Sequence, residues 1–196
     1  MPTLVTKEAP SFTAQAVMPD NTFAELTLSS YRGKYVILFF YPLDFTFVCP
    51  SEIIAFDKGL AKFKAKNAEV IGVSVDSQFS HYAWRNTPRD KGGIGQIKYP
   101  LVADLDKEIS RAYGVLSEGS VALRGLFLID KEGVVRHALV NDLPLGRSVE
   151  EALRVLDALQ YTEEHGEVCP ANWREGEDAM TPTADGVAEY LASHAG

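Results

Sequence analysis

Residues 35–52 read Tyr-Val-Ile-Leu-Phe-Phe-Tyr-Pro-Leu-Asp-Phe-Thr-Phe-Val-Cys-Pro-Ser-Glu, and this stretch decides the fold. The apolar run from Tyr35 to Tyr41 is rich in β-forming residues and too short to span a membrane, so it predicts a central strand buried on both faces. Pro42 ends that strand. Pro50 suits the first position of a helix, because its missing N–H needs no partner there. The pattern therefore predicts strand, loop and helix, with Cys49 at or beside the helix N-terminus.

A helix over residues 51–66 is supported by apolar residues at helical spacing, namely Ile53, Phe56, Leu60 and Phe63. The N-terminus of a helix favours a negative charge, so a sulfur placed there gains as a thiolate relative to the thiol. A free cysteine is more often a small buried hydrophobic residue. The strand, the proline stop, Thr46 and the helix-starting proline together favour a nucleophile instead. We expect the Cys49 sulfur to be charged and exposed, with hydrogen-bond donors around it.

The composition limits the class of protein. A chain of 196 residues with 46% hydrophobic residues is long enough for one substantial core, here one domain followed by a tail. The net charge of −8, with a pI near 5.0 and no basic run, argues against nucleic acid or a membrane as partner. The N-terminal residues Met1–Lys7 lack the apolar stretch of a signal peptide, so we expect a cytoplasmic protein.

The chain has two cysteines, Cys49 and Cys169, each within a Val-Cys-Pro triplet. The cytoplasm keeps thiols reduced, so a disulfide between them is expected to be transient and catalytic rather than structural.

The rest of the chain alternates strands and helices. We predict strands at 68–76 and 99–103, helices at 77–86 and after Asp104 or Asp106, a hairpin of strands 125–130 and 134–140, a helix at 148–159 and a short final helix around 187–191. This order predicts an α/β protein of thioredoxin-like fold, with a mixed central sheet flanked by helices and a C-terminal extension. We expect a thioredoxin-like domain over residues 1–160 and a tail over residues 161–196 that carries Cys169.

Pro42, Thr46 and Cys49 form a Pro-x-x-x-Thr-x-x-Cys pattern that, with its flanking residues, resembles the peroxidatic signature of peroxiredoxins. The similarity extends over nearly the whole chain, through residues 125–127, 140–144 and 165–170. The sequence is similar to a typical 2-Cys peroxiredoxin of the alkyl hydroperoxide reductase C class.

This resemblance implies a role for each matching residue. Cys49 would be the peroxidatic cysteine and Cys169 the resolving one, with the disulfide formed between the two subunits of an antiparallel homodimer. Five dimers commonly assemble into a decameric ring in this family. The other matching positions are Thr46 and Arg124, which contact peroxide and thiolate, Pro42, which covers the site, and Glu52 with Arg147, which form a supporting pair.

The implied reaction is reduction of hydrogen peroxide and organic hydroperoxides through a Cys49 sulfenic acid, with thioredoxin or a dedicated flavoprotein disulfide reductase as electron donor. No cofactor or metal is expected. The negative charge of Glu52 would oppose the thiolate, which predicts that Arg124 or Arg147 lies close to Glu52. Because Cys49 begins a helix, we also expect the first helical turn to unwind when Cys169 attacks the sulfenic acid.

One departure from the family concerns over-oxidation. The most easily inactivated members carry Gly-Gly-Leu-Gly in a loop and Tyr-Phe in the final helix, whereas this chain has Gly92-Gly93-Ile94-Gly95 and Tyr190-Leu191. The lost aromatic ring predicts a tail that covers Cys49 less firmly and an intermediate sensitivity to excess peroxide.

Several other functions were weighed. A dithiol reductase would need a Cys-x-x-Cys pair, which the sequence lacks. A cysteine hydrolase using His81, His137 or His165 has no supporting local motif, and His165 with Cys169 is too small a set for zinc. The main alternative is a ring-forming holdase chaperone whose assembly is switched by the cysteines.

Overall fold

The structure is a computed structural model that describes residues 3–194. The chain divides into two compact units, residues 1–149 and 150–196, which are described separately below. The outermost residues of the predicted domains, 1–2 and 195–196, lie outside the described part of the chain. The expected folding domain over residues 1–160 stays a prediction.

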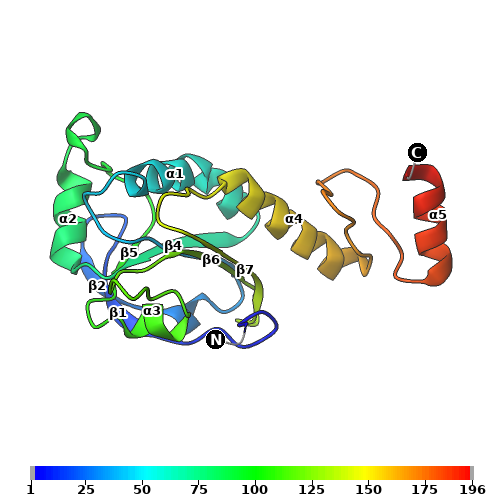
Figure 1. Ribbon diagram of the computed structural model, residues 1–196, viewed down its shortest axis with the longest axis horizontal. Helices are drawn as coiled ribbons and strands as arrows, with labels where there is room; N and C mark the ends of the chain where they lie inside the picture. Colours follow the sequence, from blue (N-terminus) through cyan, green and yellow to red (C-terminus); the bar gives the residue numbers. More distant parts are fainter. Residues whose placement is uncertain (1–2, 195–196) are drawn as a thin grey trace. The chain divides into compact units, whose positions relative to one another are not determined.

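The first unit is built on one seven-stranded mixed sheet with the order β2-β1-β5-β4-β3-β6-β7 (Figure 1). Its strands are β1 (Thr13–Val17), β2 (Phe23–Thr27), β3 (Tyr35–Phe40), β4 (Ala68–Ser74), β5 (Leu101–Ala103), β6 (Arg124–Ile129) and β7 (Val135–Asn141). The central strand β3 pairs in parallel with β4 and antiparallel with β6. This arrangement is the mixed, thioredoxin-like sheet that the sequence predicts.

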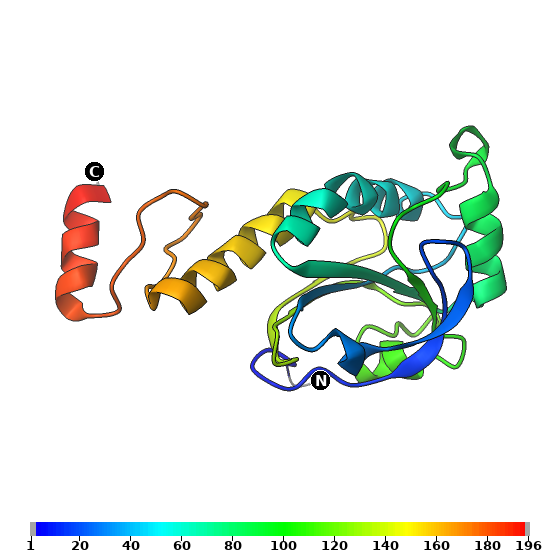
Figure 2. The same ribbon diagram turned by 180° about the vertical axis from the view of Figure 1, so that it is seen from behind.

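Helices cover both faces of this sheet. In Figures 1 and 2, α1 (Cys49–Ala65) lies on one face and α3 (Glu108–Ala112) on the other, while α2 (Gln78–Asn86) lies beside the β1–β2 end. Two 3-10 turns, η1 (Leu28–Tyr31) and η2 (Arg89–Lys91), complete the unit. Every residue of β3 is buried, as expected for a strand between two helical layers.

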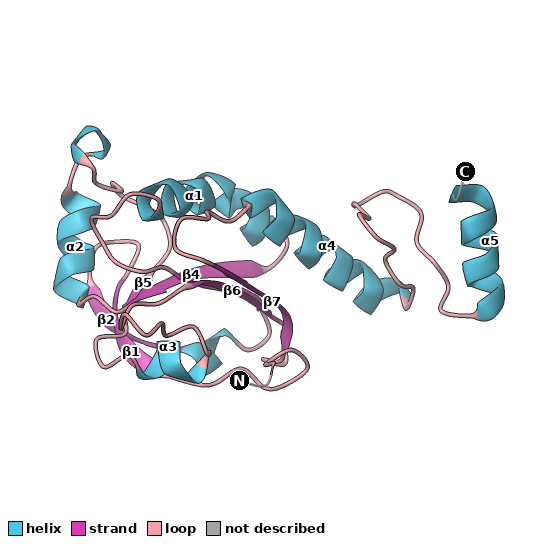
Figure 3. Cartoon of the chain, viewed as in Figure 1, coloured by secondary structure: helices cyan, strands magenta, loops and turns pink. Residues whose placement is uncertain are grey.

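The predicted elements agree well with the structure. The side chain of Ser77 caps α2 by accepting from the Ser80 N–H, and β6 with β7 forms the predicted antiparallel hairpin. Strands β1 and β2 were not predicted, because they are short and partly exposed, and residues with low β propensity such as alanine and glutamate interrupt their β-branched residues. The C-terminal helices are longer than predicted: α4 covers Val149–His165 and α5 covers Ala184–His194. Figure 3 shows the helices and strands of the first unit together with the loops that join them.

The second unit contains most of α4, an irregular segment and α5. Gly166, in the left-handed region at φ 69°, ends α4, and an isolated bridge joins Val168 to Met180. Trp173 is almost fully buried against the ring of Tyr161, with ring centroids 4.9 Å apart. Trp173 is therefore a packing residue of this unit. Among residues 3–194, no helix is both long and apolar enough to cross a membrane.

Candidate active site

Cys49 is the first residue of α1 and directly follows the loop that leaves β3. Pro50 occupies the second helical position, one later than predicted, and Val48 is the N-cap without a side-chain capping bond. The Cys49 side chain is fully buried, so the expectation of an exposed sulfur is wrong for this state. Polar partners, rather than solvent, must therefore stabilise any charge on the sulfur.

Thr46 and Arg124 supply those partners. Thr46 Oγ1 lies 2.9 Å from Cys49 Sγ and 2.8 Å from the carbonyl oxygen of Leu43. Arg124 Nη1 lies 3.4 Å from the same sulfur. A hydroxyl has one proton: it donates to the Leu43 carbonyl when the thiol donates to Oγ1, and it can donate to the sulfur when the sulfur is a thiolate.

Glu52, one turn of backbone beyond the cysteine, joins two arginines. Its Oε2 accepts from Arg124 Nη1 at 2.6 Å, and its Oε1 accepts from Arg147 Nε at 2.8 Å and from the Arg147 backbone N–H at 2.9 Å. The prediction that a cation lies beside Glu52 is confirmed for both arginines. Two guanidinium groups against one carboxylate leave a surplus positive charge, which a thiolate at position 49 would neutralise.

Backbone carbonyls fix the two arginines in place. Arg147 Nη1 donates to the Phe40 carbonyl at 2.7 Å, and its guanidinium lies 5.2 Å from the centroid of the Phe39 ring. Arg124 Nε donates to the Leu143 carbonyl at 2.6 Å. Both side chains are nearly fully buried, so the guanidinium planes have little freedom to move. The donors are thus oriented before any substrate arrives.

A second buried network holds the loop between β3 and α1, and sequence reasoning missed it. The Asp44 carboxylate accepts from the Tyr41 hydroxyl at 2.9 Å and lies 2.8 Å from His81 Nδ1. His81 Nε2 lies 3.1 Å from the Val102 carbonyl oxygen. Both ring nitrogens contact oxygen atoms of Asp44 and Val102, so neither is available to the Cys49 sulfur as a base. This geometry argues against the hydrolase that was considered with His81.

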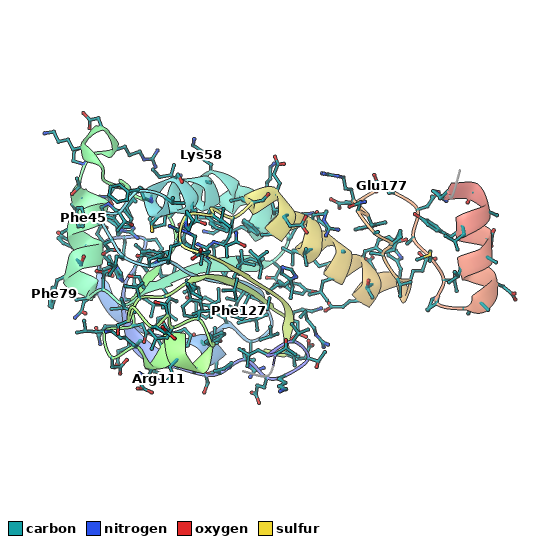
Figure 4. The ribbon with its side chains drawn as sticks, in the orientation of Figure 1. Phe45, Lys58, Phe79, Arg111, Phe127 and Glu177 are labelled. Atoms are coloured by element: carbon teal, nitrogen blue, oxygen red, sulfur yellow. The ribbon has the colours of Figure 1, made fainter. Side chains whose placement is uncertain are left out.

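The same loop presents apolar side chains outward. Pro42 is buried at its start, and its role in covering the site stays a prediction, whereas Phe47 is 96% exposed. Phe45 is also exposed, and Figure 4 shows it beside α2, on the side of the unit that also carries Phe79.

The second cysteine lies in the second unit. Cys169 is half-buried and unpaired, with its sulfur 3.6 Å from the Ala158 carbonyl oxygen and 3.8 Å from Thr162 Oγ1. Within the described residues, no group of three His, Cys, Asp or Glu side chains is arranged to hold a metal ion.

Comparisons with known proteins agree with these observations. A model described as the AhpC/TSA family matches residues 5–138, and one described as the C-terminal domain of 1-Cys peroxiredoxin matches residues 158–193. Peroxiredoxin-2 of Mus musculus is 59% identical over 189 residues, which cover 96% of this chain and 95% of that protein. Alkyl hydroperoxide reductase C of Helicobacter pylori is 60% identical over 190 residues, which cover 96% of each protein.

One solved structure is also similar to this chain. The reduced 2-Cys peroxiredoxin of Plasmodium vivax has a TM-score of 0.96 and 56% sequence identity, covering 97% of this chain and 100% of that one. These matches favour a peroxidase over a holdase as the activity of the chain. The chain belongs to the AhpC/TSA family and is a 2-Cys peroxiredoxin of thioredoxin-like fold, a thiol-dependent peroxidase.

Proposed function

We propose that Cys49 is the peroxidatic residue and that its thiolate attacks one oxygen of the peroxide. The O–O bond breaks, its electron pair leaves with the other oxygen, and that oxygen takes up a proton to become water or an alcohol. The sulfur is oxidised to a sulfenic acid. The observation that carries this proposal is the position of Cys49 Sγ, 2.9 Å from Thr46 Oγ1 and 3.4 Å from Arg124 Nη1 at a helix N-terminus.

The neighbouring residues have distinct roles in this proposal. Thr46 and Arg124 touch the sulfur and are aimed where charge develops on the departing oxygen. Glu52 and Arg147 act indirectly, because they fix the Arg124 guanidinium and balance its charge. Pro42 limits access of water from the strand side of the loop.

Cys169 is the proposed resolving residue, contributed by the partner subunit of a homodimer. Its thiol displaces the sulfenic oxygen as water and forms a disulfide with Cys49. The Cys49 sulfur is buried at the start of α1, so we propose that the first helical turn unwinds before the two sulfurs meet.

Each turnover leaves a disulfide that a dithiol donor must reduce, which supports thioredoxin or a dedicated flavoprotein disulfide reductase as partner. Hydrogen peroxide and organic hydroperoxides are the proposed substrates, and the name of the Helicobacter pylori relative supports the second class. The cytoplasm is the proposed location, because two free thiols suit a reducing compartment. Fractionation of cells, followed by detection of the protein, tests the location.

Two surfaces of the first unit support assembly into a decamer. Strand β7 forms one end of the sheet and exposes Val140, so two copies can pair their edges as an antiparallel dimer. At the other end, β2, α2 and the loop between β3 and α1 expose a set of aromatic rings that we call the aromatic surface: Phe23, Phe45, Phe79 and Tyr82. Such a surface is suited to joining five dimers into a ring.

The tail is proposed to give an intermediate sensitivity to excess peroxide. Tyr190 and Leu191 lie in α5, and Leu191 is half-exposed there in place of an aromatic ring. Mass spectrometry of peroxide-treated protein, compared with a tailless homologue, would measure the fraction of sulfinic Cys49. Equal sensitivity in the two proteins would contradict this part of the proposal.

The central test is a non-reducing gel after one equivalent of peroxide, followed by peptide mapping. We expect a Cys49–Cys169 crosslink between two chains, and none in Cys49→Ser or Cys169→Ser protein. Cys169→Ser should still consume one equivalent of peroxide, whereas Cys49→Ser should consume none. Peroxide turnover by Cys49→Ser protein would refute the assignment.

A further inference from the structure

A buried tyrosine holds the turn that begins at Cys49. The Tyr99 hydroxyl donates to the backbone carbonyl of Ile53 at 2.8 Å, inside the protein. In an α-helix the N–H of residue 53 pairs with the carbonyl of residue 49, so Ile53 closes the first turn of α1. The neighbouring Lys98 N–H donates to Asp57 Oδ1 at 2.7 Å, one turn further along the helix. The segment 97–99 is therefore attached to α1 at two successive turns.

That segment is itself fixed by a buried arginine. Arg85 is fully buried and donates from Nη1 to the Tyr99 carbonyl at 3.0 Å and from Nη2 to the Ile97 carbonyl at 2.7 Å. Nη2 also donates to Pro19 at 3.1 Å, and Nε donates to Asn21 Oδ1 at 2.9 Å. All four oxygens are uncharged, so the guanidinium acts here as a rigid connector between backbone segments. Tyr99 therefore contacts α1 from a backbone segment that Arg85 holds in place.

The tyrosine hydroxyl is a permanent donor. Burial raises the pKa of Tyr99 well above its ordinary value, so the hydroxyl keeps its proton. The Ile53 carbonyl also accepts the normal bond of an α-helix, so the bond from Tyr99 is additional. Its loss leaves no buried acceptor unpaired, and a phenylalanine fits the same space.

We propose that Tyr99 is a positioning residue that resists unwinding of the first turn of α1 and so sets the fate of the Cys49 sulfenic acid. This inference rests on the proposed function, in which that turn must open before Cys169 can react. The bond from Tyr99 to Ile53 is present in the closed helix and is lost when the turn opens. Glu52 also ties this turn, through Arg124 and Arg147, but it belongs to the active site. The hydrogen bond of Tyr99 is the interaction that can be removed without changing a residue of the active site.

Two reactions compete for the sulfenic acid. Opening leads to condensation with the Cys169 thiol, which forms the disulfide and releases water. In the closed site, a second hydroperoxide instead transfers one oxygen to the sulfur, which becomes a sulfinic acid while the peroxide is reduced to water or an alcohol. The ratio of the two products reports the balance between open and closed helix. Loss of one such hydrogen bond should shift that balance about twofold to tenfold toward the open form.

The test compares Tyr99→Phe with wild-type protein during turnover over a range of hydrogen peroxide concentrations. Mass spectrometry measures sulfinic Cys49 and the Cys49–Cys169 disulfide. We expect the peroxide concentration that half-inactivates the enzyme to rise about twofold to tenfold. The rate of the first oxidation, measured in a single turnover, should stay within about twofold of wild type, since Tyr99 does not touch the sulfur.

Tyr113→Phe is the matched control. Tyr113 is also buried and its hydroxyl also donates to a backbone carbonyl, that of Pro10 at 3.0 Å, away from α1. This control should behave as wild type. Amide hydrogen exchange in the reduced protein should accelerate at residues 51–53 in Tyr99→Phe only. An unchanged product ratio and unchanged exchange in Tyr99→Phe, with normal disulfide formation by wild type, would overturn this inference alone. Failure of wild type to form the disulfide would instead overturn the proposed function.

Discussion

At the scale of single residues, the site is organised around one hydroxyl proton and one surplus positive charge. Thr46 Oγ1 contacts both the sulfur and the Leu43 carbonyl, so its proton can follow the ionisation of Cys49. Arg124 contacts the sulfur and Glu52 with the same Nη1 atom. Positive charge is therefore present at the sulfur without a conformational change, which keeps the cost of reorganisation low in the reaction.

Removal of the Thr46 hydroxyl should slow peroxide reduction. Thr46→Val keeps the shape of the side chain but cannot donate to the sulfur or to the departing oxygen. We expect the second-order rate constant for peroxide to fall by about 10²- to 10³-fold, as for the loss of one oriented donor. Stopped-flow fluorescence or competition kinetics would measure it. Thr46→Ser restores the hydroxyl and should recover most of the rate, whereas equal defects in the two variants would exclude a role for the hydroxyl.

The residues of the site differ in how far the sequence could predict them. Cys49 and Thr46 follow from a local pattern of strand, proline and helix start. The closeness of Glu52 to its arginines follows from charge balance once the resemblance places them in one site. His81 and Tyr99 could not be predicted, because their partners are distant in sequence and nothing local marks either residue as buried. The burial of the Cys49 sulfur was missed for the same reason, because its exposure depends on segments that are distant in sequence and pack over it.

At the scale of secondary structure elements, long continuous patterns were predicted well and short mixed ones were not. The apolar run of β3, the capped start of α2 and the hairpin of β6 and β7 each carry a local signal. Strand β1 lacks one, and it joins the sheet through pairing with β2 and β5. Helix α4 continues beyond the predicted end at residue 159 because the next helix-stopping residue is Gly166.

The start of α3 should give a measurable pH dependence. Asp104 accepts from the backbone N–H groups of Ile109 and Ser110, and burial raises the pKa of its carboxyl above the ordinary value of 3.8. Because the folded state raises the pKa of Asp104, the folded protein binds more protons than the unfolded chain at pH values between the unfolded and the folded pKa. The contribution of Asp104 to stability is therefore present at acid pH and is lost as the pH rises through the folded pKa.

Asp104→Asn should remove this dependence. The free energy of unfolding of the variant, relative to that of wild type, should increase from about pH 4 to about pH 7. Urea denaturation at both values and at fixed protein concentration measures the difference. A constant relative stability would show no linkage to Asp104, and one that falls over this range would show the opposite sign of linkage.

The contact between His81 of α2 and Asp44, in the loop between β3 and α1, should be essential for stability. His81→Leu leaves the buried Asp44 carboxylate without its partner 2.8 Å away, and we expect a loss of about 1–3 kcal/mol in the free energy of unfolding. The double variant Asp44→Asn with His81→Leu removes both polar partners and should lose less than the sum of the two single effects. Additivity within about 0.5 kcal/mol in a urea double-mutant cycle would mean that the pair is not coupled.

At the scale of the whole molecule, the most exposed aromatic rings belong to the aromatic surface and to Phe47 in the loop between β3 and α1. Phe23 contacts the rings of Phe79 and Tyr82, with centroids 5.5 Å and 5.4 Å apart, so the aromatic surface is already packed within one chain. A preformed aromatic surface of this kind loses little side-chain freedom when another copy covers it.

Phe79→Ala should therefore shift the proposed decamer toward dimers. Phe79 is 66% exposed in the single chain, and its loss removes the most exposed ring of the aromatic surface. Sedimentation velocity at several protein concentrations should show that the decamer of the variant dissociates at a higher protein concentration than the wild-type decamer. Leu191→Ala removes an exposed aliphatic side chain from α5 and serves as the control. If the decamer of Phe79→Ala is as stable as that of wild type, the contact between dimers lies elsewhere.

The ring of Phe47, two residues before Cys49, is 96% exposed in the single chain, so we expect the isolated subunit to be less active than the assembly. An aromatic side chain left in water forgoes about 1.5–3 kcal/mol of burial, which a second copy can recover by covering it. Specific activity should then depend on dilution: as the protein is diluted past the dissociation of its assemblies, each subunit should work more slowly than it does in a concentrated solution.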